Sequence, residues 1–171
     1  PSLPSGLTWG TSDGKISGTP SVLQTTAVAY TVWANNSGGS TSAQINIIIN
    51  DAAPNSLSYS PENMTLTKGT TMTPNLPSVS GGAITSWEIS PSLPNGLTWG
   101  TSDGKISGTP TVLQTTASTY TVWANNSGGS VSVQVNITIN DQVPNALGYT
   151  PENMTLEKGT TMTTNTPSVS G

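Results

Sequence analysis

The 171-residue chain contains no cysteine, histidine, arginine or phenylalanine. Without cysteine it cannot form a disulfide framework, and without cysteine and histidine it lacks the usual zinc ligands and the bases that activate nucleophiles. Four lysines and no arginine leave no basic surface for nucleic acid. No apolar run approaches the roughly 18 residues of a membrane span. We therefore expect a protein that is not an enzyme, with no nucleic-acid partner and no membrane span in this segment.

Charge is also scarce, with four lysines against eight acidic residues and a net charge of −4. Charged residues make up 7% of the chain, whereas roughly 25% is typical of soluble domains. Serine and threonine together number 53, so hydroxyl groups must supply most of the solubility. Because intracellular proteins rarely have this composition, we expect an extracellular or cell-surface location.

The sequence repeats with a period of 90 residues. Residues 1–81 align with residues 91–171 without a gap, and 65 of the 81 positions are identical. Two full periods would need 180 residues, and the chain contains no second copy of residues 82–90. This near-identity indicates tandem duplication of one unit.

The boundary between repeats is predicted from the polar, proline-containing stretch 50–55, which is typical of a linker between domains. This boundary makes residues 1–52 the C-terminal part of one repeat. Residues 53–142 then form a complete repeat, and residues 143–171 form the N-terminal part of the next.

The periodic segments have the two-residue alternation of β-strands. In residues 131–140, five β-branched apolar residues alternate with five polar ones, as in a half-buried antiparallel strand. Residues 120–124 are its expected hairpin partner, because Asn, Ser and Gly between them favour a turn. Thirteen prolines and eighteen glycines leave no room for a stable helix. Further strands are expected at residues 64–66, 83–89, 97–99 and 105–107, so the fold class is all-β, with several short strands per repeat as in a β-sandwich.

Three motifs within this pattern resemble a known family. They are LPNGL at 93–97, GKISGTP at 104–110 and YTVWANN at 120–126, and each recurs 90 residues earlier with at most one change. The pattern is similar to that of the He_PIG immunoglobulin-like repeats, which are related to cadherin-like and dystroglycan-type β-sandwich domains. The resemblance implies tandem immunoglobulin-like antiparallel sandwiches. It also implies a stalk, spacer or adhesive module of a bacterial or archaeal surface protein.

Calcium is the metal to consider, because cadherin-like domains bind it at their junctions. The junctions of this chain offer Asp51 and Asp141, each followed eleven residues later by an acidic residue, Glu62 or Glu152. Calcium takes roughly six to eight oxygen ligands, and the further acidic motifs of a cadherin junction are missing. We therefore expect no cofactor and no metal site, with Asp51 and Asp141 as weak calcium candidates and a capped turn as the favoured alternative. The Asp-Gly sequences at 13–14 and 103–104 likewise predict turns.

The tryptophans allow two interpretations. They are either core or inter-repeat anchors, which we favour, or a platform on which sugar rings pack. Val122 and Trp123 are neighbours on one strand and must face opposite sides of it, so one of them is expected to point outward. The five residues are Trp9, Trp33, Trp87, Trp99 and Trp123.

The modification with most support is N-glycosylation, because the Asn-x-Ser/Thr pattern occurs five times. Two of these sites fall in the expected hairpin turns and one on the polar face of residues 131–140. The alternative is a bare polar surface. The candidate residues are Asn35, Asn63, Asn125, Asn136 and Asn153.

Together these features predict a structural component of an extracellular fibre, stalk or surface layer. The expected partners are copies of itself or neighbouring repeats, end to end, together with glycans. A half-repeat would expose Ile45, Ile47 and Ile49. Either flanking repeats in a covalent array cover them, or residues 143–171 of another copy dock onto residues 1–52 in a head-to-tail filament. The alternative function is an adhesin or a carbohydrate-binding module of a secreted or surface protein.

Overall fold

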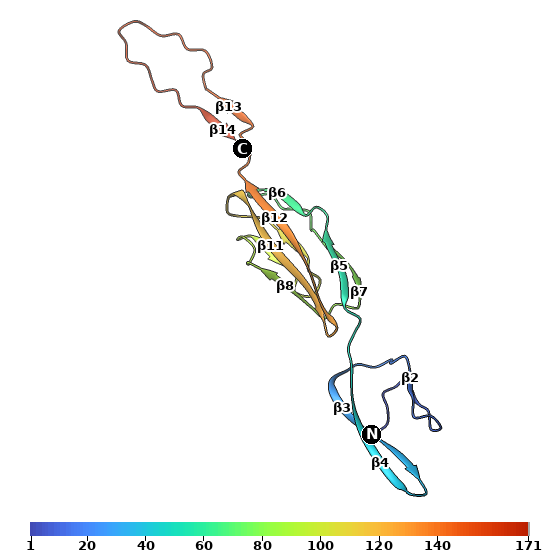
Figure 1. Ribbon diagram of the computed structural model, residues 1–171. Helices are drawn as coiled ribbons and strands as arrows, with labels where there is room; N and C mark the ends of the chain where they lie inside the picture. The colour runs from blue at the N-terminus through green and yellow to red at the C-terminus, as the bar shows by residue number, and fades with distance from the viewer. Residues whose placement is uncertain (171) are drawn as a thin grey trace.

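The computed structural model describes residues 1–170, which form an elongated chain of three segments with strands and no helix (Figure 1). The described residues therefore include no helix long and apolar enough to span a membrane. The N-terminal segment (residues 1–52) and the C-terminal segment (residues 143–170) lie at opposite ends of the middle segment (residues 53–142). The strands of the middle segment are β5 (Pro54–Tyr59), β6 (Asn63–Thr67), β7 (Pro77–Gly81), β8 (Ser86–Ser90), β9 (Leu97–Trp99), β10 (Ile106–Gly108), β11 (Gln114–Asn126) and β12 (Gly129–Asn140).

The middle segment is a two-layer sandwich. One layer is a four-stranded sheet in the order β6-β12-β11-β8, in which β6 runs parallel to β12 and the other pairs are antiparallel. The other layer consists of the pairs β5-β7 and β9-β10, which an antiparallel bridge between Asn75 and Ile106 connects. This is the strand arrangement of an immunoglobulin sandwich, with the first strand divided between the two layers.

The core lies between these layers and follows the alternation of the strands. Along β12, Val135, Ile137 and Ile139 are fully buried, and the residues between them face outward. This pattern confirms the half-buried strand predicted over residues 131–140. The buried core consists of Leu57, Tyr59, Met64, Met72, Leu97, Ile106, Tyr120, Val122, Ala124, Val135, Ile137 and Ile139.

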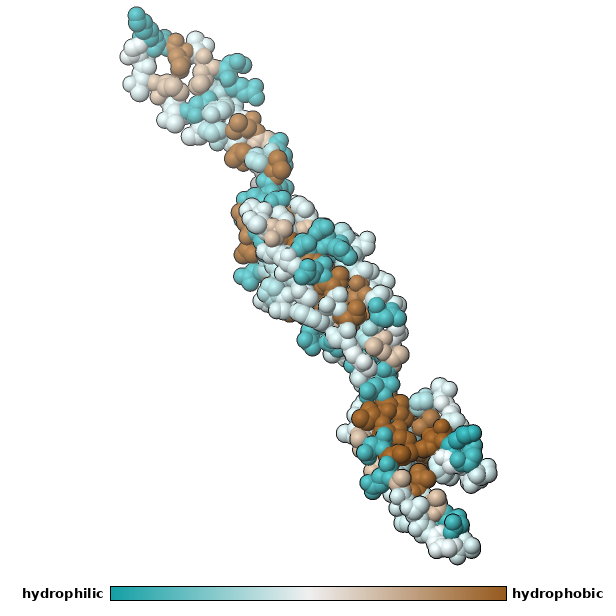
Figure 2. All heavy atoms as spheres, in the orientation of Figure 1, coloured by the Kyte–Doolittle hydropathy of each residue, from teal (hydrophilic) through white to brown (hydrophobic). Residues whose placement is uncertain are grey.

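The N-terminal segment has the strands of the second half of a sandwich, and no described residue occupies the place that β5 and β7 take in the middle segment, so its inner face is only partly covered. Its strands β1 (Leu7–Trp9), β2 (Ile16–Gly18), β3 (Gln24–Asn36) and β4 (Gly39–Ile49) pair as β1-β2 and β3-β4, with the register of β9-β10 and β11-β12. Ile45, Ile47 and Ile49 are partly exposed. The brown surface in the lower part of Figure 2 is this partly covered apolar face.

The C-terminal segment has the strands of the first half of a sandwich. Its strands β13 (Ala146–Gly148) and β14 (Ser168–Ser170) pair antiparallel, as β5 and β7 do in the middle segment. Between them the chain makes a wide loop (Figure 1). Residues 153–157, which correspond to β6, form no strand.

Two details differ from the strand predictions. The strand expected over residues 83–89 is β8 (Ser86–Ser90), because residues 82–85 cross from β7 and are held by Gly82 and Thr85, which donate backbone hydrogen bonds to Ala53 and Asn125. The linker predicted over residues 50–55 is shorter, since Pro54 already begins β5. Strands β5 and β7 escaped prediction because serine and proline dilute their apolar alternation.

Candidate functional site

The junction between the N-terminal and middle segments is held by side chains of a hairpin turn. The backbone N–H of Asp51 donates to the Ser127 hydroxyl at 2.9 Å, and this hydroxyl donates to Oδ2 of Asp51 at 3.0 Å. Asn126 Nδ2 donates to the Ala52 carbonyl at 2.7 Å. The turn between β11 and β12 therefore binds the chain that leads into its own sandwich.

Glycines allow this close approach. A Cβ on Gly128 would overlap the Asp51 carbonyl, and a Cβ on Gly82 would overlap the Ala52 carbonyl. The linker thus runs in a narrow passage between two glycines. At the equivalent Gly38, the nearest atom to an added Cβ is Asn36 Oδ1 at 3.3 Å, because no linker crosses that turn.

The second junction, residues 140–145, shares four of its six residues with residues 50–55, and no hairpin turn of a following sandwich lies beside it among the described residues. Asp141 is exposed, and its Oδ1 accepts a hydrogen bond of 3.2 Å from the N–H of Gln142. This contact joins adjacent residues, and residues 141–145 form no turn.

The structure does not bring the acidic residues of the junctions together. Glu62 lies at the other end of the sandwich from Asp51, where its carbonyl accepts a hydrogen bond from the N–H of Asn136. Seven residues of β12 separate Gly129 from Asn136, and at a strand's rise per residue this is roughly 23 Å. Residues 1–170 contain no group of three or more acidic residues placed to hold a metal ion.

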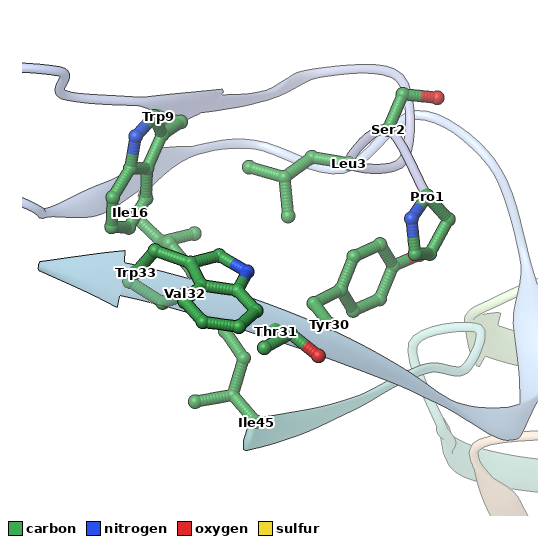
Figure 3. Close-up of a pocket in the computed structure, with 10 residues that line it drawn as sticks. All are labelled: Pro1, Ser2, Leu3, Trp9, Ile16, Tyr30, Thr31, Val32, Trp33 and Ile45. Atoms are coloured by element: carbon green, nitrogen blue, oxygen red, sulfur yellow. The ribbon is translucent and has the colours of Figure 1, made fainter. Parts of the chain in front are cut away.

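One hollow lies in each end segment, and each is lined in part by residues whose equivalents form the core of the middle sandwich. The N-terminal hollow, of about 410 Å³, is lined by residues that include Leu3, Trp9, Ile16, Tyr30 and Ile45 (Figure 3). The C-terminal hollow, of about 400 Å³, is lined by Leu147, Gly148, Tyr149, Glu152, Met154 and Asn165.

The Asp-Gly sequences form tight turns, as predicted. In each copy the aspartate accepts a hydrogen bond from the backbone of the lysine two residues on, at 3.2 Å for Asp13 and 3.1 Å for Asp103. The hydrogen bonds from the backbone and side chain of Lys15 hold the pKa of Asp13 below its ordinary value. These carboxylates stabilise their own turns.

The tryptophans lie in two kinds of surroundings. Trp87 and Trp99 pack against the buried core. Trp123 lies on the outer face of the four-stranded sheet, because its neighbours Val122 and Ala124 are the ones that enter the core. Its equivalent Trp33 is 61% exposed.

The five glycosylation candidates differ in how accessible their side-chain amides are. Asn35 and Asn153 are exposed. Asn125 Nδ2 donates to Glu88 Oε1 at 3.1 Å, and Asn136 Nδ2 donates to Oδ1 of Asn63 at 2.8 Å. An amide nitrogen that already donates within the protein is less available for a sugar than one in open solvent.

Sequence reasoning missed several polar groups that lock the sandwich. Asn75 is buried, pairs with Ile106 and donates through Nδ2 to the Pro61 carbonyl at 2.8 Å, while its Oδ1 has no partner. The Tyr59 hydroxyl donates to the Gly104 carbonyl. Burial, together with the nearby Asp103 carboxylate, raises the pKa of Tyr59 above its ordinary value. The signal in the sequence was the recurrence of both residues in the second copy, as Asn165 and Tyr149.

The arrangement of the strands agrees with a comparison against protein families. A model described as "Putative Ig domain", He_PIG, matches residues 1–50 and 54–140. The chain belongs to the He_PIG family. The two matched stretches correspond to the N-terminal segment and to the strands of the middle sandwich, which makes the chain a tandem of He_PIG domains. No curated protein matches the chain.

Similar solved structures are immunoglobulin-domain proteins of low identity. A chimeric titin Z1Z2-Z1Z2 tandem is 18% identical, with a TM-score of 0.36, over 67% of the He_PIG chain and 65% of its own. The N-terminal eight Ig domains of a Down Syndrome Cell Adhesion Molecule isoform are 15% identical, with a TM-score of 0.43, over 86% and 20%. Extracellular domains 3–5 of Drosophila OTK are 16% identical, with a TM-score of 0.42, over 81% and 47%. The He_PIG chain spans less than two thirds of the length of each.

Proposed function

We propose that this chain is a structural segment of an extracellular fibre, stalk or surface layer, in which immunoglobulin-like sandwiches follow one another in a line. Residues 53–142 are the folding unit, and the role of each unit is to extend the array and to carry tension along it. The observation that carries the proposal is the parallel pairing of β6 with β12, which belong to the first and last parts of the sandwich.

This pairing suits a protein under tension. Five residue pairs connect the strands, from Asn63 opposite Asn136 to Thr67 opposite Asn140. Tension on the two ends of the sandwich draws β6 toward its N-terminus and β12 toward its C-terminus, so two parallel neighbours slide in opposite directions. Sliding loads all the hydrogen bonds between them together, whereas opening a hairpin loads them one at a time. The sandwich is therefore strongest along the line of the array.

The junction supports the same role. Asp51 and Ala52 are bound to Asn126 and Ser127, so the entry to the sandwich is fixed to its surface. A linker held in this way limits bending between neighbouring units. Stacked units with fixed entries form an extended spacer.

Single-molecule pulling tests the proposal, and the absence of native cysteine allows the pulling points to be chosen. One variant carries Ala53→Cys and Gln142→Cys, which applies force at the start of β5 and the end of β12, so that tension reaches β6 through β5. The matched control carries Thr121→Cys and Gln134→Cys, two residues that face each other on β11 and β12, so the force opens a hairpin. We expect a rupture force several-fold higher in the first geometry. Equal forces would refute a load-bearing role.

A second function, sugar binding, is favoured by one observation. Trp123 and Trp33 lie outside the core on the same strand position of two repeats, where an aromatic face could pack against a carbohydrate ring. A glycan array with the wild-type chain and a Trp123→Ala variant distinguishes the two functions. A spacer binds no glycan, and an adhesin loses binding in the variant.

Glycosylation belongs to the proposed extracellular setting. We expect sugars first on Asn35 and Asn153, whose side chains are exposed, and last on Asn125 and Asn136, whose amides donate hydrogen bonds. Mass spectrometry of peptides from the native protein checks this order. Bare asparagine at all five positions would remove glycans from the proposal.

A further inference from the structure

Asn95 and Gly96 form the one Asn-Gly pair in the sequence. They occupy the two central positions of a β-turn, in which the backbone N–H of Leu97 donates to the Pro94 carbonyl at 3.1 Å. Gly96 has a φ of +90°, as the third position of a type II turn requires, and glycine adopts this angle without strain. Both central residues are exposed. The turn therefore presents to solvent an asparagine side chain and the peptide nitrogen that follows it.

An asparagine side chain in this setting can react with the next peptide nitrogen. The nitrogen attacks Cγ of the asparagine, the Cγ–Nδ2 bond breaks, and the side-chain nitrogen leaves as ammonia with the proton of the peptide N–H. Water then opens the cyclic imide at one of its two carbonyl carbons and gives aspartate or isoaspartate. Glycine in the next position favours the attack, because no Cβ shields its nitrogen. The reaction consumes only water, and its net result is a carboxylate in place of the amide.

The two reacting groups of the Asn-Gly pair are not engaged by other parts of the chain. Within residues 1–170, the Gly96 N–H donates to no backbone carbonyl, and the Asn95 side chain makes no hydrogen bond. The turn is instead held through carbonyl oxygens, those of Pro94, Asn95 and Gly96. The Asn95 side chain is thus able to rotate toward the Gly96 nitrogen.

The two Asp-Gly pairs of the chain, which form the same imide, have both reacting groups engaged. The Gly104 N–H donates to the Gly100 carbonyl at 2.8 Å. Oδ1 of Asp103 accepts a hydrogen bond from the N–H of Lys105 at 3.1 Å. The equivalent bonds are present in residues 10–15 of the first copy. Hydrogen bonds therefore restrain these turns from the reaction that remains open to Asn95.

Asn-Ser is the next most reactive pair in this sequence, and its three occurrences also have engaged side chains. Asn126 donates to the Ala52 carbonyl at 2.7 Å and accepts from the N–H of Gly128 at 2.8 Å. Asn36 and Asn55 likewise accept hydrogen bonds through Oδ1. Both the sequence and the hydrogen bonds thus single out Asn95.

We propose that Asn95 is a site of spontaneous deamidation in the folded protein, and that its conversion to isoaspartate loosens residues 109–111. In isoaspartate the main chain runs through Cβ and Cγ, so the turn gains one methylene and the former Asn95 carbonyl becomes a free carboxylate. That carbonyl accepts hydrogen bonds from the N–H and the hydroxyl of Thr111, at 2.9 and 3.2 Å. The Gly96 carbonyl accepts another from the N–H of Thr109 at 2.9 Å. A longer turn displaces these contacts together.

Residues 109–111 brace the end of the sandwich that β6 approaches. Pro110 is fully buried, and its carbonyl accepts a hydrogen bond from the N–H of Gly69 at 2.8 Å. Gly69 lies two residues after β6, the strand that pairs with β12. Deamidation of one exposed turn therefore disturbs a buried residue beside β6. It also adds a negative charge to a chain that has few charges.

The first copy has the same turn without the reactive residue. Ser5 stands where the second copy has Asn95. Gly6 has a φ of +88°, and the N–H of Leu7 donates to the Pro4 carbonyl at 3.0 Å. A serine has no side-chain carbonyl carbon for the nitrogen to attack. The two copies therefore differ in chemical lifetime at this turn, and the turn accommodates the change Asn95→Ser.

Peptide mass spectrometry of the full 171-residue chain, incubated in its folded state at a mildly alkaline pH, tests the proposal. We expect Asn95 to convert several-fold faster than every other asparagine, with isoaspartate as the main product. Asn95→Ser should abolish this modification and leave the other peptides unchanged. Asn55 and Asn126, each of which precedes a serine, are internal controls and should remain amides.

Thermal unfolding separates the longer main chain from the added charge. The isoaspartate form of the wild type should have a Tm several degrees lower than the fresh chain, because the hydrogen bonds to Thr111 are lost. Freshly prepared Asn95→Asp has the charge on an unaltered main chain, so its Tm should equal that of the fresh wild type. Incubated Asn95→Ser should keep its Tm.

Three results would overturn the proposal. They are an Asn95 that remains an amide in the folded chain, a faster conversion at Asn55 or Asn126, and an isoaspartate form whose Tm equals that of the fresh chain. The pulling experiment uses fresh protein, so none of these results decides the proposed function.

Discussion

Truncation of one isoleucine in each copy tests whether residues 53–142 are the cooperative unit. Ile137 and Ile47 occupy equivalent positions in strands that share seven of eleven residues, 129–139 and 39–49. Ile137 is 0% exposed in the core, whereas Ile47 is partly exposed on the inner side of β4. The variants Ile137→Ala and Ile47→Ala therefore remove the same atoms from equivalent positions of two similar strands, and the main difference between them is the tertiary surroundings.

The expected effect follows from burial. Replacing a buried isoleucine by alanine costs about 3 kcal/mol, because it loses transfer free energy and leaves a cavity. In a unit of this size, each 1 kcal/mol lowers the Tm by roughly 4–8 °C, so Ile137→Ala should lower the Tm by roughly 12–24 °C. Ile47→Ala removes no packing from the folded unit, so its Tm should change by less than about 3 °C.

Scanning calorimetry of the full chain measures both values. A single transition, shifted by Ile137→Ala alone, is the expected result. Equal shifts in the two variants would mean that the N-terminal segment unfolds together with the middle sandwich. The reasoning about where the folding unit begins would then be refuted.

Two further predictions concern the junction and the buried tyrosine. In Gly128→Ala, the added Cβ would overlap the Asp51 carbonyl and displace the linker from the turn, so limited proteolysis within residues 50–53 should become several-fold faster. The control is Gly38→Ala, at the turn that no described linker crosses, and it should leave the rate of proteolysis unchanged. Tyr59 has a pKa raised above its ordinary value of 10.0 by burial and by Asp103, so its contribution to stability is complete below that value and is lost as the pH rises beyond it. Denaturant unfolding measures the free energy of unfolding at pH 9 and at pH 11. From pH 9 to pH 11 this free energy should fall less for Tyr59→Phe than for the wild type. Equal falls would contradict the role of the Tyr59 hydroxyl.

Most of the fold could be predicted from the sequence because its strands are set by local pattern. The hairpin of β11 and β12 has strict alternation and a turn rich in Asn and Gly, and both its strands and its turn were expected. The same hairpin forms as β3 and β4, where only the β1-β2 pair of the second layer is present. Strands β5 and β7 could not be recognised, since their alternation is carried by only a few apolar residues, such as Leu57 and Tyr59.

The sites were less predictable because they depend on contacts distant in sequence. Asp51 was expected in a capped turn, and its partner Ser127 is 76 residues away. The unpaired Oδ1 of Asn75 and the outward placement of Trp123 follow from how the layers meet. A period of 90 residues showed that such residues recur, but not what they touch.

Comparing the two copies of the repeat separates what the sequence determined from what the tertiary structure determined. The sequence alone determined the 90-residue repeat, the all-β class and the hairpins, because turns and alternation act within a few residues. Residues 63–66 and 153–156 have the same sequence, NMTL, yet only the first stretch is part of a strand, β6. Strand β6 forms because β12 lies beside it and supplies hydrogen-bond partners. A strand at the edge of a sheet exists only through its neighbour, and the tertiary structure decides whether that neighbour is present.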